Sequence, residues 1–125
     1  MVEYFTHAYF QNIADLLNAD PAFQEKASNL STQLLFIAKD KGRAFLFKVE
    51  KGKVSAEPAT PETPAEFAFT SDYATWVTNH RDGKTLEMLI MSGKVRMKGS
   101  IPRILQLKSQ LGAVDQKARS IPAVY

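Results

Sequence analysis

Apolar and polar residues at the start of the chain follow the spacing of two helices. From Tyr4 to Asn18, apolar side chains recur every three or four residues, at Phe5, Tyr9, Ile13, Leu16 and Leu17. This spacing predicts a helix with one buried stripe. Asp20-Pro21 then supplies an N-cap and a proline at the first helical position. A short second helix ending near residue 27 is therefore expected.

The pattern changes to short apolar runs with period two after Ser31. Residues 34–38 and 44–49 are rich in Leu, Phe, Ile and Val and flank a Lys-Asp-Lys-Gly segment, which is typical of a β-hairpin. A turn at Gly52 leads to a third strand through Val54 and Ala56. Prolines at 58, 61 and 64 predict an exposed loop, because proline donates no hydrogen bond to a sheet. Residues 67–69 then predict a fourth strand.

The second half of the chain alternates helix and strand signals. Asp72 ends a capping cluster before a short helix through Trp76, and Thr85 caps a helix over residues 86–91 that is apolar enough to be buried on more than one side. Residues 95–98 alternate as a fifth strand. Ser100 caps a last helix in which Ile101, Ile104, Leu107 and Leu111 form the inward stripe. Gly112 is expected to end this helix, and the tail from Ala113 to Tyr125 is expected to lie on the surface.

These elements predict an α+β fold. The strands cluster into hairpins rather than alternating regularly with helices, which favours a five-stranded, mainly antiparallel sheet covered on one face by helices. The chain has 125 residues, a length that suits one hydrophobic core, so residues 1–125 are interpreted as a single domain.

Composition is that of an ordinary globular protein, with 45% apolar and 23% charged residues and a net charge of +3. No apolar run is long enough to span a bilayer and the N-terminus lacks the pattern of a secretory signal, so a cytoplasmic location is expected. The chain has no cysteine. Its densest basic stretch, residues 94–98, alternates strictly, which favours the solvated face of a strand over a phosphate-binding stripe. No nucleic-acid partner is predicted.

Candidate catalytic or metal-binding groups are few. His7 and His80 have no acidic or histidine neighbour at helical spacing, so both are interpreted as structural. The six glycines are scattered and form no phosphate-binding loop. We therefore predict no catalytic residues, no metal and no cofactor. A catalytic function would require a cluster of polar groups inside a cavity.

Flexible apolar side chains are concentrated between residues 86 and 97, where Met88, Met91 and Met97 occur together. Methionine adapts to irregular apolar shapes, including ligand pockets. Such a set is more often ordinary core than pocket, so these residues alone do not decide between the two.

The order of elements between Phe67 and Leu107 resembles the sterol carrier protein type 2 family of lipid-transfer domains. In that family a strand leads into a helix carrying a Trp or comparable residue. A second helix then ends in a Gly-Lys-apolar-polar-apolar-x-Gly element that precedes the closing helix. Here the corresponding stretches are Phe67 to Trp76 and Met91-Ser-Gly-Lys-Val-Arg-Met-Lys-Gly-Ser-Ile-Pro102. Together with the preceding meander, the resemblance covers residues 30–110. Ser100 stands where the family has Asp or Asn, and still provides an N-cap.

The resemblance implies a non-catalytic protein that holds a fatty acid, fatty acyl-CoA, sterol or similar apolar ligand in a hydrophobic tunnel between the sheet and the helices. The implied tunnel residues are Phe45, Phe47, Phe67, Phe69, Trp76, Leu86, Leu89, Ile90, Val95, Met97, Ile104 and Leu107. An alternative is an interaction or accessory subunit whose tunnel is filled by its own side chains. Implied partners are an apolar small molecule and, transiently, a membrane or a partner enzyme, with the chain acting as a monomer or homodimer. The chain ends Ala123-Val124-Tyr125 rather than in a peroxisomal Ser-Lys-Leu signal, so transfer between membranes stays open.

Overall fold

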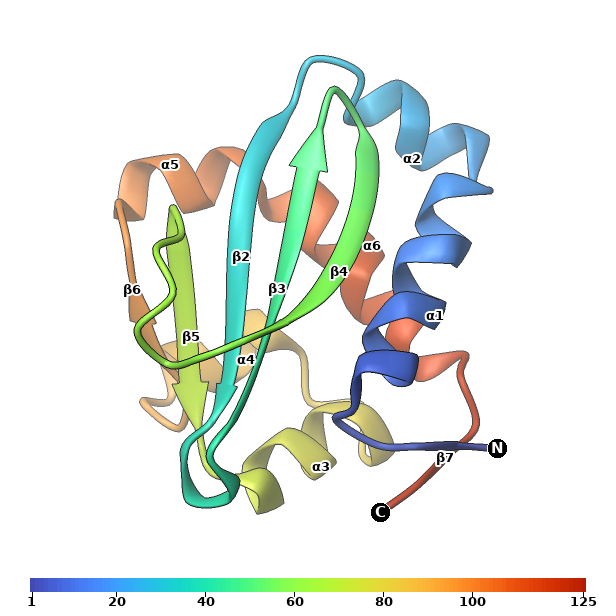
Figure 1. Ribbon diagram of the computed structural model, residues 1–125. Helices are drawn as coiled ribbons and strands as arrows, with labels where there is room; N and C mark the ends of the chain where they lie inside the picture. Colours follow the sequence, from blue (N-terminus) through green and yellow to red (C-terminus); the bar gives the residue numbers. More distant parts are fainter.

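A five-stranded sheet organises the fold (Figure 1), as seen in a computed structural model that describes residues 1–125. Its strands are β2 (Ser31–Ala38), β3 (Arg43–Glu50), β4 (Lys53–Ala59), β5 (Phe67–Ser71) and β6 (Arg96–Lys98), arranged in the order β4-β3-β2-β5-β6. The β2–β5 pair is parallel and the other three pairs are antiparallel. The predicted α+β class is confirmed, and the sheet is mixed because the chain crosses from β4 to the far side of β2 before it forms β5.

Six helices accompany the sheet: α1 (His7–Asn18), α2 (Pro21–Lys26), α3 (Tyr73–Arg81), α4 (Leu86–Met91), α5 (Ile101–Gln106) and α6 (Lys108–Arg119). A 3₁₀ turn (η1, Lys39–Lys41) joins β2 to β3, and the two chain ends form a short parallel pair of β1 (Val2–Glu3) and β7 (Ala123–Val124). Figure 1 shows α6 running behind the sheet and both termini at the same corner. None of the helices has the length and apolar character needed to traverse a bilayer.

Helix starts follow the predicted capping residues. The side chains of Asp20, Asp72, Thr85 and Ser100 each accept a hydrogen bond from a backbone N–H in the first turn of the helix that follows. These bonds satisfy N–H groups that have no partner within the helix. The first helix starts later than predicted, at His7 rather than Tyr4, because Thr6 provides its cap.

The main core lies between one face of the sheet and the helices. Phe36 of β2 is paired with Phe45 of β3 and Phe69 of β5, so all three side chains point to this face. They pack with aromatic residues of the N-terminal segment, among them Phe10, whose ring stacks on Phe45 at a centroid distance of 4.9 Å. Aromatic side chains of α1 and of the sheet therefore pack directly against one another.

The opposite face of the sheet is covered by the chain itself. Leu35, Ile37 and Leu46 point to this face and are buried together with Ala44. The connection from β4 to β5 crosses in front of β3 and β2 in Figure 1. Ala65 of this connection and Ala59 at the end of β4 pack against the cluster. Helices thus cover one face of the sheet, as predicted, and a loop covers the other.

Two predicted boundaries near prolines and glycines are wrong. Pro58 was predicted to lie in a loop. It lies instead within β4, where it is paired with Phe45 of β3. β4 is an edge strand, so one side of it needs no hydrogen bond and proline is tolerated there. Gly112 does not end the last helix but lies in the interior of α6, which continues to Arg119. A glycine inside a helix costs only about 1 kcal/mol, which packing of the helix can offset.

The C-terminal tail is part of the core rather than a surface segment, contrary to the prediction. Ala118 and Ile121 are buried, and Ala118 belongs to the stripe of α6 that faces the sheet. The last helix was predicted to be single, but it is divided into α5 and α6 at Leu107. This residue is buried, and the chain turns there so that α6 can cross the sheet. Ile101 was predicted to point inward and is instead 57% exposed.

The helix over residues 86–91 is also buried on one side only. Leu86 and Leu89 are buried, whereas Met88 and Met91 are 52% and 80% exposed. The prediction that this helix is enclosed on several sides is therefore wrong, because α6 packs against one side of it and its outer face is left free.

Candidate functional site

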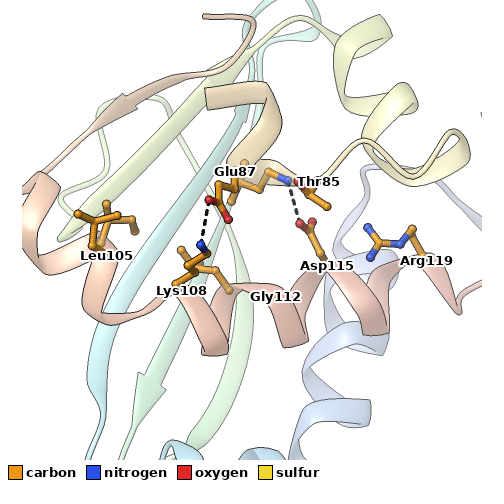
Figure 2. A pocket seen from close by; sticks show the side chains of 10 residues that line it. Thr85, Glu87, Leu105, Lys108, Gly112, Asp115 and Arg119 are labelled. Atoms are coloured by element: carbon orange, nitrogen blue, oxygen red, sulfur yellow. Dashed lines mark hydrogen bonds and ion pairs between the residues drawn. The ribbon is translucent and has the colours of Figure 1, made fainter. Parts of the chain in front are cut away.

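An open pocket of about 170 Å³ lies where α4 meets α5 and α6 (Figure 2). The lining residues come from all three helices: Thr85, Leu86, Glu87, Ile104, Leu105, Lys108, Leu111, Gly112, Asp115 and Arg119. We call this space the outer pocket. Its floor is built from Leu86, Ile104 and Leu111, and a Cβ atom at Gly112 would have no neighbour within 4 Å. The outer pocket therefore combines an apolar floor with room along α6.

Charged side chains stand around the rim of the outer pocket. Lys108 at the start of α6 forms an ion pair with Glu87 of α4, with 3.2 Å between Nζ and Oε1. Arg119 lies at the opposite end of the pocket and forms no ion pair. Figure 2 shows the Lys108–Glu87 pair bridging the two helices, with Arg119 apart from it. The rim thus offers one cation that is free to meet a negatively charged group.

Asp115 connects three helices at the inner wall of the outer pocket. One oxygen of its carboxylate accepts a hydrogen bond from the backbone N–H of Leu86 at 2.8 Å, and the other accepts one from the amide of Asn79 at 3.1 Å. Burial raises the pKa of Asp115, although these two hydrogen bonds and Arg119 oppose the shift. The side chain therefore holds the start of α4 and the end of α3 against α6.

Two smaller cavities share lining residues with the outer pocket. The first has a volume of about 30 Å³ and lies between α1, the sheet and α6, and the second, of about 20 Å³, lies between β2, β3, α2 and α6. The outer pocket and the first cavity share Leu86, Leu111 and Asp115. The two inner cavities share Leu111 and Val114. One face of α6 thus lines all three spaces in succession, and Leu111 borders every one of them.

Aromatic rings form the far wall of the first inner cavity. Its lining includes Phe5, Phe10 and Trp76, and the indole N–H of Trp76 donates to the Ile37 carbonyl at 2.8 Å. Tyr4 and Tyr9 also border it, and burial is the main reason that the pKa of each phenol is raised. The Tyr4 hydroxyl donates to the Trp76 carbonyl, so this polar atom and the indole N–H are both engaged within the protein and the wall is largely apolar.

The histidines have structural partners. His7 Nε2 donates to the Ala56 carbonyl at 3.0 Å, which ties α1 to β4. His80 Nε2 donates to the Ile121 carbonyl at 2.8 Å, and its other ring nitrogen is hydrogen-bonded to the Tyr125 hydroxyl. No three His, Asp or Glu side chains are grouped to hold a metal ion. The titratable groups near the cavities thus support the helix and chain-end packing.

The structure brings together some of the predicted tunnel residues. Phe47, Trp76 and Leu86 line the first inner cavity, Leu86 and Ile104 the outer pocket, and Leu107 the second inner cavity. Leu89 borders a separate surface pocket of about 230 Å³ with Thr78, Lys84, Met88, Ser92 and Lys94. The remaining predicted residues, Phe45, Phe67, Phe69, Ile90, Val95 and Met97, pack in or against the core and line none of these spaces.

Leu111 was predicted to point inward, but sequence reasoning missed the cavity-lining residues of α6 beyond Gly112. Val114, Asp115 and Ala118 continue the helical spacing of Leu111, and the apolar signal extends to Ile121. This periodic signal is present in the sequence, but Gly112 was interpreted as the end of the helix. The N-terminal aromatic residues were predicted to be buried, but not to border a cavity, because only the fold brings α1 next to α6.

Comparison with known proteins gives a family and a fold. The family model of the SCP-2 sterol transfer family matches residues 11–112. No curated protein matches the chain. Among solved structures, a Thermus thermophilus protein described as a candidate sterol carrier protein is 22% identical, with a TM-score of 0.84 and coverage of 99% of this chain and 93% of that one. A crystal structure of sterol carrier protein 2 is 23% identical, with a TM-score of 0.81 and coverage of 96% and 100%. A UbiJ-SCP2 ubiquinone synthesis protein is 16% identical, with a TM-score of 0.66 and coverage of 89% and 94%.

Proposed function

The chain belongs to the SCP-2 sterol transfer family, and we propose that it is a non-catalytic lipid-binding protein that carries one elongated apolar ligand. The proposed ligand is a fatty acid, a fatty acyl-CoA, a sterol or a similar apolar molecule. The observation that supports this proposal most directly is the set of three spaces along α6, from the open outer pocket to the cavity walled by aromatic rings, each of which is lined by Leu111.

In this proposal the ligand enters at the outer pocket and its hydrocarbon tail extends inward past Leu111. The inner cavities are narrow, so the tail must displace side chains there. Leu111 and Val114 are the side chains best placed to move, because both are only half-buried and both border the second cavity. A negatively charged head at the opening would lie close to Arg119, which has no competing ion pair.

The affinity expected from this arrangement is moderate. Burying ~10 methylene groups contributes roughly 8 kcal/mol before the cost of ordering the ligand, which corresponds to about micromolar binding at best. The contacts are mainly apolar, so we expect chain length and shape to matter more than the chemistry of the tail.

A titration with a fluorescent fatty acid, followed by displacement with unlabelled fatty acids, tests the proposal. Leu111→Trp should fill the junction of the three spaces and weaken binding at least about tenfold, equivalent to about 1.4 kcal/mol. Gln116→Trp is the matched control, because it adds the same side chain at an exposed position of the same helix. Equal binding by both variants would contradict the proposed path, and native mass spectrometry of the wild type would show any co-purified lipid.

A second candidate function is an interaction or accessory subunit with a filled interior. The small volumes of the inner cavities, about 30 and 20 Å³, favour it, because ligand sites commonly measure about 300–1,000 Å³. A protein with this function would bind no fatty acid and co-purify with no lipid while remaining folded. The same titration on the wild type therefore separates the two functions.

A further inference from the structure

Gln110 in the first turn of α6 has a side-chain oxygen without a partner. Its amide nitrogen donates a hydrogen bond to the Lys26 carbonyl at the end of α2, at 3.2 Å. Its carbonyl oxygen, Oε1, is buried and accepts no hydrogen bond, and no other buried side-chain nitrogen or oxygen is left in this state. Buried polar groups in proteins are nearly always hydrogen-bonded, so this exception calls for an explanation.

The orientation of the Gln110 amide is fixed by Lys26. A backbone carbonyl can only accept a hydrogen bond, so the amide nitrogen of Gln110 has to face it. Turning the amide over would set two acceptors against each other. Oε1 is thereby directed away from the Lys26 carbonyl and keeps its full capacity to accept. A donor for Oε1 therefore has to come from a bound molecule.

Gln110 borders a small and otherwise apolar space. It is one of nine residues that line the second inner cavity, and Thr32 is the only other polar one. The Thr32 hydroxyl already donates to the Glu66 carboxylate, so its proton is not available to Gln110. The cavity measures about 20 Å³, which is room for one hydroxyl group, since a single water needs at least about 10–15 Å³. The cavity thus combines hydrocarbon walls with one free acceptor.

We propose that Gln110 Oε1 accepts a hydrogen bond from a hydroxyl group at the inner end of the bound ligand. This inference rests on the proposed function, in which the hydrocarbon part of the ligand extends inward past Leu111. Leu111 lines the outer pocket and both inner cavities, so the part of the ligand beyond it can reach the second inner cavity. A methyl end there leaves Oε1 buried and unpaired, whereas a hydroxyl end supplies the missing donor. Gln110 is therefore a specificity-determining residue that favours hydroxyl-ended ligands over wholly apolar ones of the same length.

A bound water is the alternative donor. Water in a protein interior makes about two to four hydrogen bonds, and the side chains around this cavity offer only Gln110 Oε1 and the Thr32 oxygen. A ligand hydroxyl needs only one of these partners, because its own hydrocarbon body holds it in place. The two donors differ in their consequence. A water satisfies Oε1 whatever ligand is bound, whereas a ligand hydroxyl makes the affinity depend on the end group of the ligand.

Displacement of a fluorescent fatty acid compares two ligands that differ only at the inner end. Hexadecanoic acid and 16-hydroxyhexadecanoic acid share the same chain length and the same carboxylate. Gln110→Met keeps the length of the side chain but removes the acceptor, and it should lower the ratio of the two affinities, hydroxylated over unsubstituted, about tenfold. Gln116→Met is the control, because it makes the same change at an exposed position of the same helix and should leave the ratio at the wild-type value. A purely structural role of Gln110 would weaken the binding of both ligands alike.

Cholesterol and its 3-methyl ether form a second pair of ligands. The ether keeps the oxygen but has no proton to donate, so Gln110→Met should lower the preference for cholesterol over the ether if the ligand is a sterol. The pair of ligands whose affinity ratio changes identifies whether a fatty chain or a sterol carries the hydroxyl.

The outcomes separate this inference from the proposed function. Affinity ratios that Gln110→Met leaves unchanged in both pairs would overturn the inference and assign Oε1 to a bound water, while the carrier function would stand. Failure of the wild type to bind any of the four compounds would overturn the proposed function and the inference with it. The ¹³C NMR signal of the Gln110 side-chain carbonyl gives a check that needs no variant. It should shift when the hydroxylated ligand of a pair binds and stay in place with the other, and equal shifts would contradict the hydrogen bond.

Discussion

The two ends of the helical layer differ in how firmly they are packed. At the end formed by α1 and the chain termini, five of the twelve residues of α1 are buried, and its aromatic rings contact those of β2 and β3. At the other end, α5 has no buried residue and α4 has only Leu86 and Leu89. The largest open spaces also border α4.

This difference separates the part of the molecule that holds the fold together from the part that can admit a guest. A region with few buried apolar contacts opens locally at lower free energy than a closely packed one. The proposed ligand path begins in the loosely packed end and leads toward the closely packed one. We therefore expect the α4–α5 edge to move when a ligand enters, while α1 and the sheet stay in place.

The largest expected contrast between the two ends is in stability. Phe47 is 1% exposed and its ring meets those of Phe10 and Phe36 at centroid distances of 5.5 and 5.6 Å. Phe47→Ala should lower the free energy of unfolding by about 3–5 kcal/mol. Met91→Ala in the loosely packed end should change it by less than about 0.5 kcal/mol. Urea denaturation measures both, and similar losses would show that the two ends are packed alike.

One position of the open end is nevertheless tightly constrained. Gly99 joins β6 to α5 with φ of +141°, and a Cβ atom there would lie 2.5 Å from Cδ1 of Phe67 and 2.9 Å from the Glu66 carbonyl oxygen. Gly99→Ala should therefore cost about 2–4 kcal/mol through backbone strain and overpacking. Gly93→Ala is the control, because Gly93 also has a positive φ but open space around it. A smaller loss at Gly99 than at Gly93, measured by thermal denaturation, would contradict this prediction.

Asp115 links the two ends and should make stability depend on pH. Burial raises its pKa above the ordinary value of 3.8, so the folded state binds this proton more tightly than the unfolded state does. The resulting stabilisation is fully present below pH 3.8 and is lost as pH rises through the higher pKa of the folded state. The free energy of unfolding of the wild type, relative to that of Asp115→Asn, should therefore increase on acidification.

An exposed aspartate gives the control of opposite sign. The hydrogen bonds from Arg81 lower the pKa of Asp82, so its stabilisation is present above the unfolded pKa and is lost on acidification. The wild type should thus lose stability relative to Asp82→Asn as pH falls. Urea denaturation of the wild type, Asp115→Asn and Asp82→Asn over an acidic pH series measures both differences in the free energy of unfolding. If the two differences changed in the same direction with pH, Asp115 would not be held in an apolar setting.

The contrast between the two ends also explains what the sequence could predict. The alternation in β2, β3 and β5 and the caps at Asp20, Asp72 and Thr85 are local signals, and the structure confirms the elements that they predicted. The exposure of Met88 and Met91 depends instead on which neighbours reach α4, which no local pattern encodes. The part of α6 beyond Gly112 that lines the cavities was not predicted. A glycine is a strong helix-end signal unless packing further along the chain outweighs it.

Gly112 gives the smallest and most informative prediction. It lies inside α6, has no positive φ, and meets no atom within 4 Å of a Cβ position, so neither backbone conformation nor close packing requires a glycine there. Gly112→Ala should raise the free energy of unfolding by about 0.5–1 kcal/mol, because alanine loses less conformational entropy in a helix. Gly112 also lines the outer pocket, so its lack of a side chain keeps space at the proposed entrance. Gly112→Leu should therefore weaken fatty-acid binding without loss of stability, and Ser109→Leu, at an exposed position one turn earlier, should leave binding unchanged.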